Sequence, residues 1–367
     1  MKKMLAIAVC LSVLLCGCVK EAQPAAGASE NKLIVVGFSQ VGAESEWRVA
    51  NTKSMKDTLS EENGYEMIFD DARNMQENQI WAIRTFIQQG VDYIVFSPRV
   101  ETGWDSVLQE AKEAGIPVIV IDREIEAGDE GLYTAYIGSD FRKEGEKAVQ
   151  WLEDLLKKQE RTEDPVRIVH IQGTIGSSAQ IGRTNALEQA IKRNSNWEMV
   201  AQECGDFTRA KAYEVMGSIL KQTEDIDVVY CENDGEALGA IDAMEEAGLK
   251  CNVIGGEAID AIDSEALDAN DGEALDTNDA MEEAELKSNA NDGVIVISFD
   301  ATKLGLEYCL EGKIALDVEC NPLQGPYVDG IIKRLQNGEP IEREKYIDET
   351  QFDCFTITPD MIKGRGY

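Results

Sequence analysis

The sequence is poor in positive charge. Its 367 residues include 35 Lys and Arg against 69 Asp and Glu, which gives a formal net charge of −34. Nucleic-acid phosphates need a basic face, so this balance excludes a nucleic-acid partner. The length is too great for one compact core and suits two α/β domains.

Histidine and clustered cysteine are also scarce. The only histidine, His170, lies inside the apolar segment VRIVHIQ, where we expect a core role. No C-x-x-C pair occurs among the six cysteines after the leader, so we expect no zinc site; their pairing stays open. We find no nucleophile–base pair, metal cluster or phosphate loop, and we therefore predict no cofactor and no enzymatic activity.

Long apolar runs are confined to the beginning of the chain. Lys2 and Lys3 precede a 12-residue apolar stretch, 4–15, which is typical of a signal peptide. Leu15-Cys16-Gly17-Cys18 resembles a bacterial lipobox, which predicts that 1–18 is a lipoprotein signal and that Cys18 is lipidated; the alternative is an ordinary secretory signal. Residues 19–31 are small and polar and predict a flexible tether. No later segment has 18 consecutive apolar residues, so we expect no spanning helix in the body.

Short apolar segments alternate with helical patterns from residue 32 to about 300. The first half has predicted strands at 32–39, 65–72, 91–98 and 116–123 and helices at 47–62, 76–89 and 105–115. The pattern restarts with a helix at 140–159 and a strand at 166–174, followed by units at 180–194, 197–203, 208–223, 226–231 and 235–248. Continuous apolar strands between helices indicate a parallel sheet that is covered on both faces. The sequence therefore predicts an α/β protein with two doubly wound lobes.

A duplicated acidic segment interrupts this alternation. DGEALGAIDAMEEAGLKCN (234–252) recurs as DGEALDTNDAMEEAELKSN (271–289), with 14 of 19 aligned positions identical. Asn278 stands where the first copy has Ile241, so the packing face is spoiled, and residues 257–293 hold 13 Asp or Glu against one Lys. We predict that 257–293 is an acidic surface insertion, partly helical or disordered. Its acidic spacing does not match a calcium-binding loop.

Polar side chains follow the predicted strands. In doubly wound sheets, ligands bind at the carboxyl ends of the strands. Those ends carry Ser39-Gln40, Ser97-Pro98-Arg99, Asp122-Arg123, Gln172-Gly173-Thr174, Asp206-Phe207, Glu232-Asn233-Asp234 and Ser298-Phe299-Asp300. Glu44, Trp47 and Arg48 follow the first of them. Facing edges of the two lobes would form a cleft lined by hydrogen-bonding groups.

Six ordered motifs carry a resemblance to a known family. They are VGFSQVGAESEWR (36–48), QENQIWAIRTFIQQGVDYIVFSP (76–98), ETGWDSVLQEAKEAGIPVIVIDR (101–123), QGTIGSSAQIGR (172–183), GDFTRAKAYEVM (205–216) and the final GRGY. With these motifs the sequence resembles the sugar-binding lipoproteins of ABC transporters, which have the periplasmic-binding-protein type 1 fold, and it is most similar to the galactofuranose-binding subgroup. The likeness covers about 32–250 and 294–367.

The resemblance implies two lobes joined by a three-strand hinge. The N-terminal lobe would comprise 32–138 plus 322–342, and the C-terminal lobe 139–318 plus 343–367. It also implies a monomer outside the cytoplasm, attached to a bacterial membrane only through the lipid anchor. A monosaccharide would be the ligand, and an ABC permease with its ATPase would be the partners. The alternative function is a sugar-sensing module for a chemoreceptor or sensor kinase.

A monosaccharide site needs planar hydrogen-bonding groups and an aromatic platform. The residues that we predict to bind the ligand, partly by position at strand ends and partly through the resemblance, are Ser39, Glu44, Trp47, Arg48, Trp104, Asp122, Arg123, Arg183, Phe207, Asn233, Asp300 and Asn321. The resemblance supplies Arg183, Asn233, Asp300 and Asn321.

Several of these residues have a structural alternative. Asp122 and Arg123 would otherwise form a local salt bridge, and Arg183 would lie on a helix surface. Asn233 and Asp300 are also suited to capping the helices that follow them. Trp47 is suited to a hydrophobic staple at the start of its helix. The segment NPLQGP leaves Asn321 and Gln324 as alternatives at the third crossing.

Overall fold

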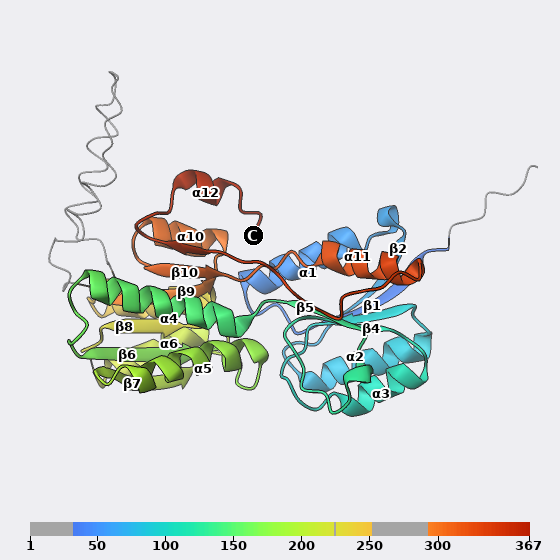
Figure 1. Cartoon of the computed structure of the whole chain (residues 1–367), viewed down its shortest axis with the longest axis horizontal. Coiled ribbons are helices and arrows are strands. Elements are labelled where there is room, and N and C mark those ends of the chain that lie inside the picture. The colour runs from blue at the N-terminus through green and yellow to red at the C-terminus, as the bar shows by residue number, and fades with distance from the viewer. Residues whose placement is uncertain (1–31, 224, 252–292) are drawn as a thin grey trace, which may run out of the picture. The chain divides into compact units, whose positions relative to one another are not determined.

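The fold is described from a computed structural model, which describes residues 32–223, 225–251 and 293–367 (Figure 1). The predicted signal peptide, the predicted tether and all of the predicted insertion except Gly293 lie outside these residues. The unit from Leu33 to Tyr367 contains two lobes, each built on its own six-stranded sheet.

The first lobe has a wholly parallel sheet in the order β11-β5-β4-β3-β1-β2. Its strands are β1 (Ile34–Gln40), β2 (Tyr65–Asp71), β3 (Tyr93–Phe96), β4 (Val118–Asp122), β5 (Ala135–Gly138) and β11 (Glu344–Tyr346). Helices α1 (Glu46–Thr58) and α11 (Gly325–Gln336) pack on one face through Met55, Val328 and Ile332. Helices α2 (Gln76–Gln89) and α3 (Asp105–Glu113) cover the other face. Both faces are therefore buried, as the continuous apolar strands predict.

The second lobe repeats this arrangement, with the sheet order β12-β10-β9-β8-β6-β7. Its strands are β6 (Val166–Gln172), β7 (Trp197–Cys204), β8 (Val228–Cys231), β9 (Ile295–Asp300), β10 (Leu316–Glu319) and β12 (Gln351–Asp353), which is antiparallel to β10. Helices α4 (Phe141–Lys158) and α5 (Ser178–Arg193) cover one face. The other face is covered by α6 (Arg209–Leu220), α7 (Asp234–Glu246), α10 (Lys303–Leu310) and α12 (Pro359–Lys363). Short 3₁₀ helices occupy Glu61–Asn63 and Glu130–Leu132.

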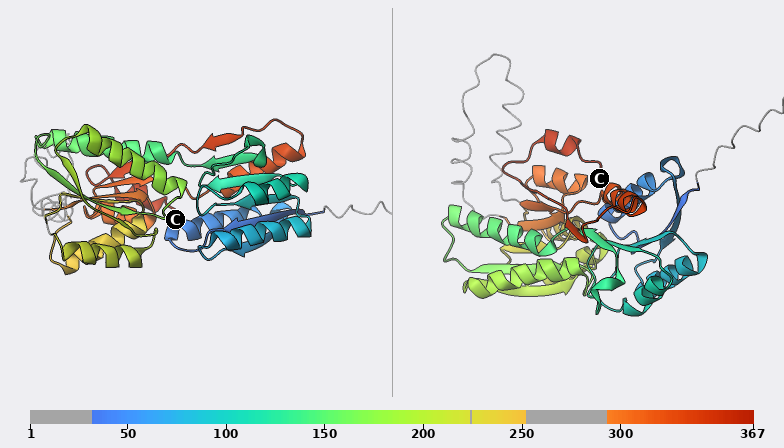
Figure 2. Two further views of the ribbon diagram at one scale, coloured as in Figure 1. Left: turned by 90° about the horizontal axis from the view of Figure 1, so that it is seen from below. Right: turned by 45° about the vertical axis from the view of Figure 1, so that its right-hand side comes forward.

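The two doubly wound lobes confirm the predicted fold class, and Figure 2 shows each sheet lying between its helices. Within the described residues, three segments cross between the lobes: one joins β5 to α4, one joins β10 to α11, and one joins β11 to β12. The predicted lobe boundary at 342/343 is wrong, because β11 pairs with β5 and so belongs to the first lobe. Its sequence, Glu-Lys-Tyr, is polar and exposed, so no apolar pattern marks it as a strand.

Helix starts at the strand ends are fixed by short polar side chains. Ser45, Asp140, Ser177 and Asn233 each accept a hydrogen bond from a backbone N–H in the first turn of α1, α4, α5 and α7. Such caps satisfy donors that a helix end leaves unpaired. The first turns of these four helices are thereby held at the carboxyl edge of their sheets, where the site residues lie.

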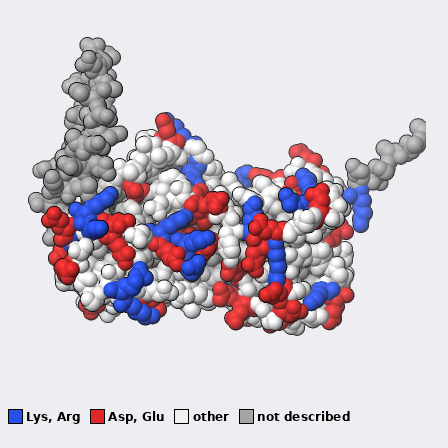
Figure 3. Space-filling view, viewed as in Figure 1, with Lys and Arg blue, Asp and Glu red and all other residues white. Residues whose placement is uncertain are grey.

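Charge and thiol placement complete the description. In the view of Figure 3, acidic and basic side chains are interspersed and form no field of one sign. Among the described residues, no helix has the length and apolar character needed to cross a bilayer. His170 is fully buried, as predicted. The thiols of Cys204, Cys231, Cys251, Cys309 and Cys320 are free, and all but the first are buried.

Candidate ligand-binding site

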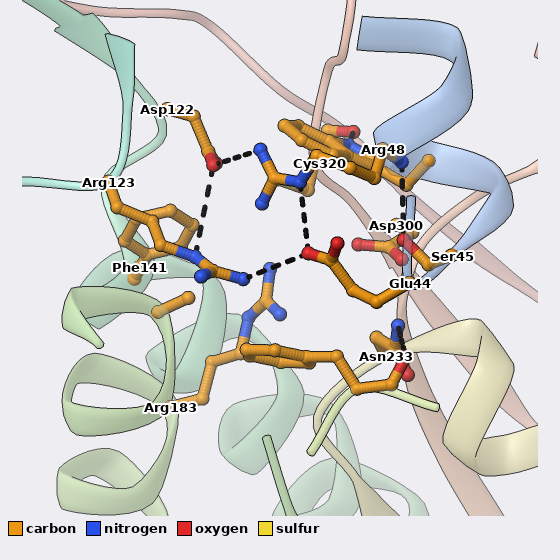
Figure 4. A pocket seen from close by; sticks show the side chains of 13 residues that line it. Glu44, Ser45, Arg48, Asp122, Arg123, Phe141, Arg183, Asn233, Asp300 and Cys320 are labelled. Carbon is orange, nitrogen blue, oxygen red and sulfur yellow. Dashed lines mark hydrogen bonds and ion pairs between the residues drawn. The ribbon is translucent and has the colours of Figure 1, made fainter. Parts of the chain in front are cut away.

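Residues from both lobes and one crossing segment line a cavity at the carboxyl edges of the sheets. Its empty volume is about 300 Å³, which includes space open to solvent. Its lining residues are Glu44, Ser45, Trp47, Arg48, Asp122, Arg123, Phe141, Ala179, Arg183, Phe207, Asn233, Asp300 and Cys320. Nine of the twelve residues predicted from the sequence are among them. Figure 4 shows Arg48, Arg123, Arg183 and Glu44 converging on one space.

Trp47 and Arg48 enter the cavity because α1 begins immediately after the loop that follows β1. Ser45 is the N-cap of α1, and its Oγ accepts from the Arg48 N–H over 3.2 Å. The Trp47 Nε1–H donates to the Cys320 carbonyl over 2.6 Å, and the Arg48 guanidinium lies 4.6 Å from the Trp47 ring centroid. The first turn therefore places an aromatic ring and a cation side by side.

Arg48 is the most firmly held cation in the first lobe's part of the cavity. Its Nη1 donates to Asp122 Oδ2 over 2.6 Å and to Ser97 Oγ over 3.0 Å, and its Nε donates to Glu44 Oε1 over 3.0 Å. Burial alone would lower the pKa of Arg48, but the Asp122 and Glu44 carboxylates raise it above its usual value. Arg48 is therefore a fixed charge that orients the Asp122 and Glu44 carboxylates.

Arg123 is buried but loosely held. It is 3% exposed, and its nearest carboxylate oxygens, on Glu44 and Asp122, lie 3.7 and 3.8 Å away. Its one hydrogen bond within the described chain is from Nη1 to the Arg99 carbonyl, over 3.3 Å. Burial and the neighbouring Arg48 cation lower the pKa of Arg123 to about 10. Most of its five donors are thus directed at the cavity without a strong partner.

Arg183 is anchored from the second lobe by Glu144. The Arg183 Nε and Nη2 both lie 2.7 Å from Glu144 Oε2, and Nη1 donates to the Glu232 carbonyl. A Cβ on Gly182 would lie 2.7 Å from Phe141 Cβ, and one on Gly145 would lie 2.6 Å from Ala186 Cβ. These two glycines let α4 and α5 approach closely enough for the buried pair to form. Glu144 raises the pKa of Arg183 despite the opposing effect of burial.

Two acceptor groups in the cavity lack a donor within the described chain. Glu44 Oε2 is buried and has no hydrogen-bond partner there. The Asp300 carboxyl, on a residue that is 5% exposed, likewise makes no hydrogen bond to a described residue. Burial, with a smaller effect of Asp234, raises the pKa of Asp300 well above its usual value. Buried polar groups are nearly always paired, so these acceptors indicate a ligand that can donate hydrogen bonds.

Apolar surface closes the cavity around these polar groups. Trp47, Phe141, Ala179, Phe207 and Cys320 form one buried cluster that joins the two lobes and a crossing segment. The Arg123 guanidinium lies 5.0 Å from the Phe207 ring centroid. Trp47 packs on Phe141 and Phe207 of the second lobe.

Backbone geometry turns two carboxyl groups into the cavity. Asp122 and Asp300 have φ values of 65° and 113°, a region that non-glycine residues occupy at a cost of about 1–3 kcal/mol. The Tyr136 hydroxyl donates to the Asp122 carbonyl over 2.8 Å, and Asp317 accepts from the N–H that follows Asp300 over 2.9 Å. The neighbouring groups therefore hold both strand ends in a conformation that directs the carboxyls inward.

The helix-capping alternatives have different outcomes. Asn233 does cap α7, accepting from the Glu236 N–H over 2.8 Å, and it also lines the cavity. Asp300 caps no helix, because Thr302 is the N-cap of α10. Arg183 is 2% exposed, so the helix-surface alternative is wrong.

Three predicted site residues do not line the cavity. Trp104 is fully buried in the first lobe's core beside Phe96, and its Nε1 donates to the Val100 carbonyl over 2.7 Å. Ser39 is also buried away from the cavity lining. The Asn321 side chain instead accepts from the Leu323 N–H over 2.8 Å. Its alternative, Gln324, accepts a hydrogen bond from the side chain of Asn51 in α1. Neither Asn321 nor Gln324 lines the cavity.

Trp104→Phe separates a core role from a ligand-binding role. We expect a loss of about 1–3 kcal/mol in the free energy of unfolding, because one buried hydrogen bond and part of the indole packing disappear. Ligand affinity should remain within twofold of the parent protein. Trp81→Phe is the matched control, since Trp81 is 69% exposed. Chemical denaturation and calorimetric titration measure both quantities, and a large loss of affinity would return Trp104 to the binding site.

Four lining residues were missed by the sequence prediction: Ser45, Phe141, Ala179 and Cys320. Phe141 is the first residue of α4, directly after the first crossing, and Cys320 lies on the second. The restart of the pattern at residue 140 marks this position in the sequence. Ala179 and Cys320 carry no chemical signal that would have distinguished them from core residues.

One group of side chains has the composition of a metal site. Ligand atoms of Glu144, Cys320 and Glu349 lie within 4.8 Å of one another, and no other such trio occurs in residues 32–223, 225–251 and 293–367. However, Ser139 Oγ and the Asn321 N–H both donate to Glu349 Oε1, and Arg183 is bonded to Glu144. Donors and a cation already occupy these oxygens, so a metal ion fits poorly.

Comparison with known proteins is consistent with this geometry. The family described as periplasmic binding protein domain matches residues 36–286. The chain belongs to this family. This periplasmic binding protein is 43% identical over 220 residues to the galactofuranose-binding protein YtfQ of Escherichia coli K12; the match spans 59% of this chain and 67% of that one.

Two solved structures share the fold over most of their length. A Mycobacterium smegmatis protein in complex with β-D-fucofuranose has a TM-score of 0.74 and 39% identity, covering 90% of this chain and 93% of that one. The binding protein of the arabinose ABC transporter from Shewanella sp. ANA-3, bound to α- and β-L-arabinofuranose, has a TM-score of 0.73 and 34% identity, covering 90% and 95%. These likenesses place the periplasmic binding protein among sugar-binding relatives.

Proposed function

We propose that this protein captures a monosaccharide between its two lobes and delivers it to an ABC importer. The observation that carries the proposal is the combination of unpaired acceptors on Glu44 and Asp300 with unused donors on Arg123 in one buried cavity. A hydroxyl donates and accepts at once, so a polyol satisfies both kinds of group. The furanoses named for the relatives support this class of ligand.

The charge balance of the cavity favours a neutral ligand. Arg48 is paired with Asp122 and Glu44, and Arg183 is paired with Glu144. The remaining cation, Arg123, lies between the same two carboxylates as Arg48. An anionic ligand would meet these carboxylates, whereas a sugar accepts from the guanidinium groups and donates to the carboxylates.

Nine of the predicted residues would contact the sugar: Glu44, Trp47, Arg48, Asp122, Arg123, Arg183, Phe207, Asn233 and Asp300. The Trp47 and Phe207 rings offer apolar faces to the C–H side of a sugar ring. The three crossings would act as a hinge, and the ligand would favour the closed arrangement because it is bound from both lobes. A permease and its cytoplasmic ATPase would then accept the loaded protein.

Membrane attachment and oligomeric state are further parts of this proposal. The lipobox-like Leu15-Cys16-Gly17-Cys18 supports a lipid anchor on Cys18 after removal of a signal peptide, with 19–31 as a tether. The protein would work as a monomer outside the cytoplasm, as a binding protein rather than an enzyme. The insertion at 257–293 would remain outside the binding function.

A thermal-shift and calorimetric screen tests the proposal. We expect D-galactose, D-fucose or L-arabinose, each of which includes furanose forms in solution, to stabilise the body of the protein. A sugar at about 100 times its Kd adds roughly 2.7 kcal/mol to the free energy of unfolding. Sulfate and inorganic phosphate are the controls for a generic anion site. Stabilisation by the anions and by none of a broad panel of pentoses and hexoses would refute the sugar-binding function.

A further inference from the structure

The three crossing segments meet at a buried cluster of polar side chains. Ser139 lies on the first crossing, Cys320 on the second and Glu349 on the third, and Glu144 reaches them from the first turn of α4. Ser139 Oγ donates to Glu349 Oε1 over 2.6 Å and lies 3.3 Å from Cys320 Sγ. The hinge is therefore held together by one small group of side chains.

The hydrogen-bond count in this cluster is one donor short. Glu349 Oε1 accepts from Ser139 Oγ and the Asn321 N–H, both over 2.6 Å, and Glu144 Oε2 accepts from Arg183. Glu144 Oε1 has no donor within the described chain, although Glu144 is 1% exposed. A carboxyl oxygen of Glu349 and one of Glu144 lie within 4.8 Å of each other. Two ionised carboxylates repel each other, so the missing donor is a proton on one of them.

We propose that Glu144 and Glu349 share one proton, and that this protonated pair is a positioning unit that links all three hinge segments to Arg183. The pair's influence on ligand affinity rests on the function proposed above; its influence on stability does not. Arg183 points into the cavity, and Glu144 holds it through two contacts of 2.7 Å. The position of a ligand-facing guanidinium thus depends on a carboxyl pair at the hinge rather than on the cavity wall alone.

The surroundings of the pair favour its protonated form. Burial, together with the Glu144 charge, raises the pKa of Glu349 to about 9. The charged or titratable groups that face the pair are Arg183 on α5, Lys147 on α4, Cys320 on the second crossing and Asp300 at the end of β9. Burial raises the pKa of the Cys320 thiol well above its usual value.

The sign of the pH effect follows from the raised pKa. The folded protein retains a proton that the unfolded chain releases near the ordinary carboxyl pKa, so the stabilisation is complete below that value. It is lost as pH rises and is gone once pH has passed through about 9. Above that pH, the Glu144 and Glu349 side chains are both ionised and repel each other at the hinge. The Arg183 guanidinium, which separates them from the cavity, is the cation beside them.

The first experiment needs no ligand. We expect the thermal midpoint of the parent protein to fall between about pH 5 and pH 9. The midpoint of Glu349→Gln should fall markedly less over this range, because its amide donates to Glu144 at every pH. Glu144→Gln should reduce the pH dependence of the thermal midpoint in the same way. Agreement between the two variants would show that the effect does not come from a folding defect in one of them. Glu110→Gln, at a surface pair with Arg84, is the matched control and should follow the parent protein. Coincident profiles for the parent and both hinge variants would overturn the shared proton.

The second experiment measures the positioning role by calorimetric titration with whichever of D-galactose, D-fucose and L-arabinose stabilises the protein. If only the protonated pair is competent, affinity falls about tenfold one pH unit above the pKa. The loss of affinity with rising pH should be smaller in Glu349→Gln. An equal loss in the parent protein and in Glu349→Gln would overturn the positioning role. A pH profile of affinity that changes when a chelator is added would show that a metal ion, and not a proton, joins the two carboxylates. If the proposed function is wrong, no sugar stabilises any variant at any pH. The thermal midpoints measured without ligand would still test whether Glu144 and Glu349 share a proton.

Discussion

We expect Arg123→Ala to abolish the stabilisation by sugar while leaving the unliganded protein folded. Arg123 has one hydrogen bond of 3.3 Å to a described residue and no carboxylate oxygen within 3.5 Å. Its removal leaves no buried charge without a partner, since Glu44 and Asp122 both remain bonded to Arg48. The folded state therefore loses little, whereas the ligand loses its most available set of donors.

The expected size of this effect is large. Each hydrogen bond to a charged group contributes about 1.5–3 kcal/mol, so the loss of two such bonds weakens binding by roughly 100-fold or more. Arg123→Lys should recover only part of the affinity, because an ammonium cannot contact two oxygens in the fixed geometry of a guanidinium. Arg84→Ala, at an exposed pair, is the control. Titration calorimetry measures the affinities, and a response to sugar that survives Arg123→Ala unaltered would show that the pocket assignment is wrong.

Arg183→Met has the largest expected effect on stability. Both hydrogen-bonding contacts to Glu144 Oε2 come from Arg183, and both residues are almost fully buried. Removing the cation leaves a buried carboxylate without its partner, which costs about 3–5 kcal/mol. Without the cation, the pKa of Glu144, already raised by burial, should rise further, so the loss should be smaller in acid than at neutral pH.

A double variant distinguishes a lost charge partner from lost packing. Arg183→Met with Glu144→Leu removes both charges, and buried ion pairs replaced by apolar residues often lose little stability. We therefore expect the double variant to recover at least half of the single variant's loss in denaturant unfolding. Arg193→Met, an exposed position of the same helix, should change stability by about 0.5 kcal/mol or less. A single variant as stable as this control would show that the ion pair contributes nothing.

The fold was predictable because several of its strands are short apolar runs that are buried along their whole length. β4, Val-Ile-Val-Ile-Asp, is buried at every position, and β3 is likewise buried throughout. Such runs, separated by helical patterns, admit little other than a parallel sheet with two covered faces. The short β11 and β12 escaped prediction because they are three-residue segments at sheet edges; β11 is polar and exposed throughout, and β12 is partly exposed.

The site was predictable where it depends on strand ends and not where it depends on packing. Asp122, Arg123 and Asp300 lie at or directly after strand ends, so the topology alone brings them to the carboxyl edges of the two sheets. Trp104 has the same residue type as Trp47, but its loop folds into the core beneath Phe96. Sequence spacing cannot distinguish these two tryptophans, because the direction of each ring is set by tertiary contacts. The Glu144–Arg183 pair depends on two close-packed glycines, which become meaningful only once the helices are seen together.

The free thiols have a consequence for a protein that works outside the cytoplasm. Cys231, Cys251, Cys309 and Cys320 are shielded only by the folded structure. Each global opening exposes them together to an oxidising medium, where incorrect disulfides trap the chain before it refolds. Survival after export is therefore governed by how rarely the molecule opens, and a slow unfolding rate protects it more than a large equilibrium stability.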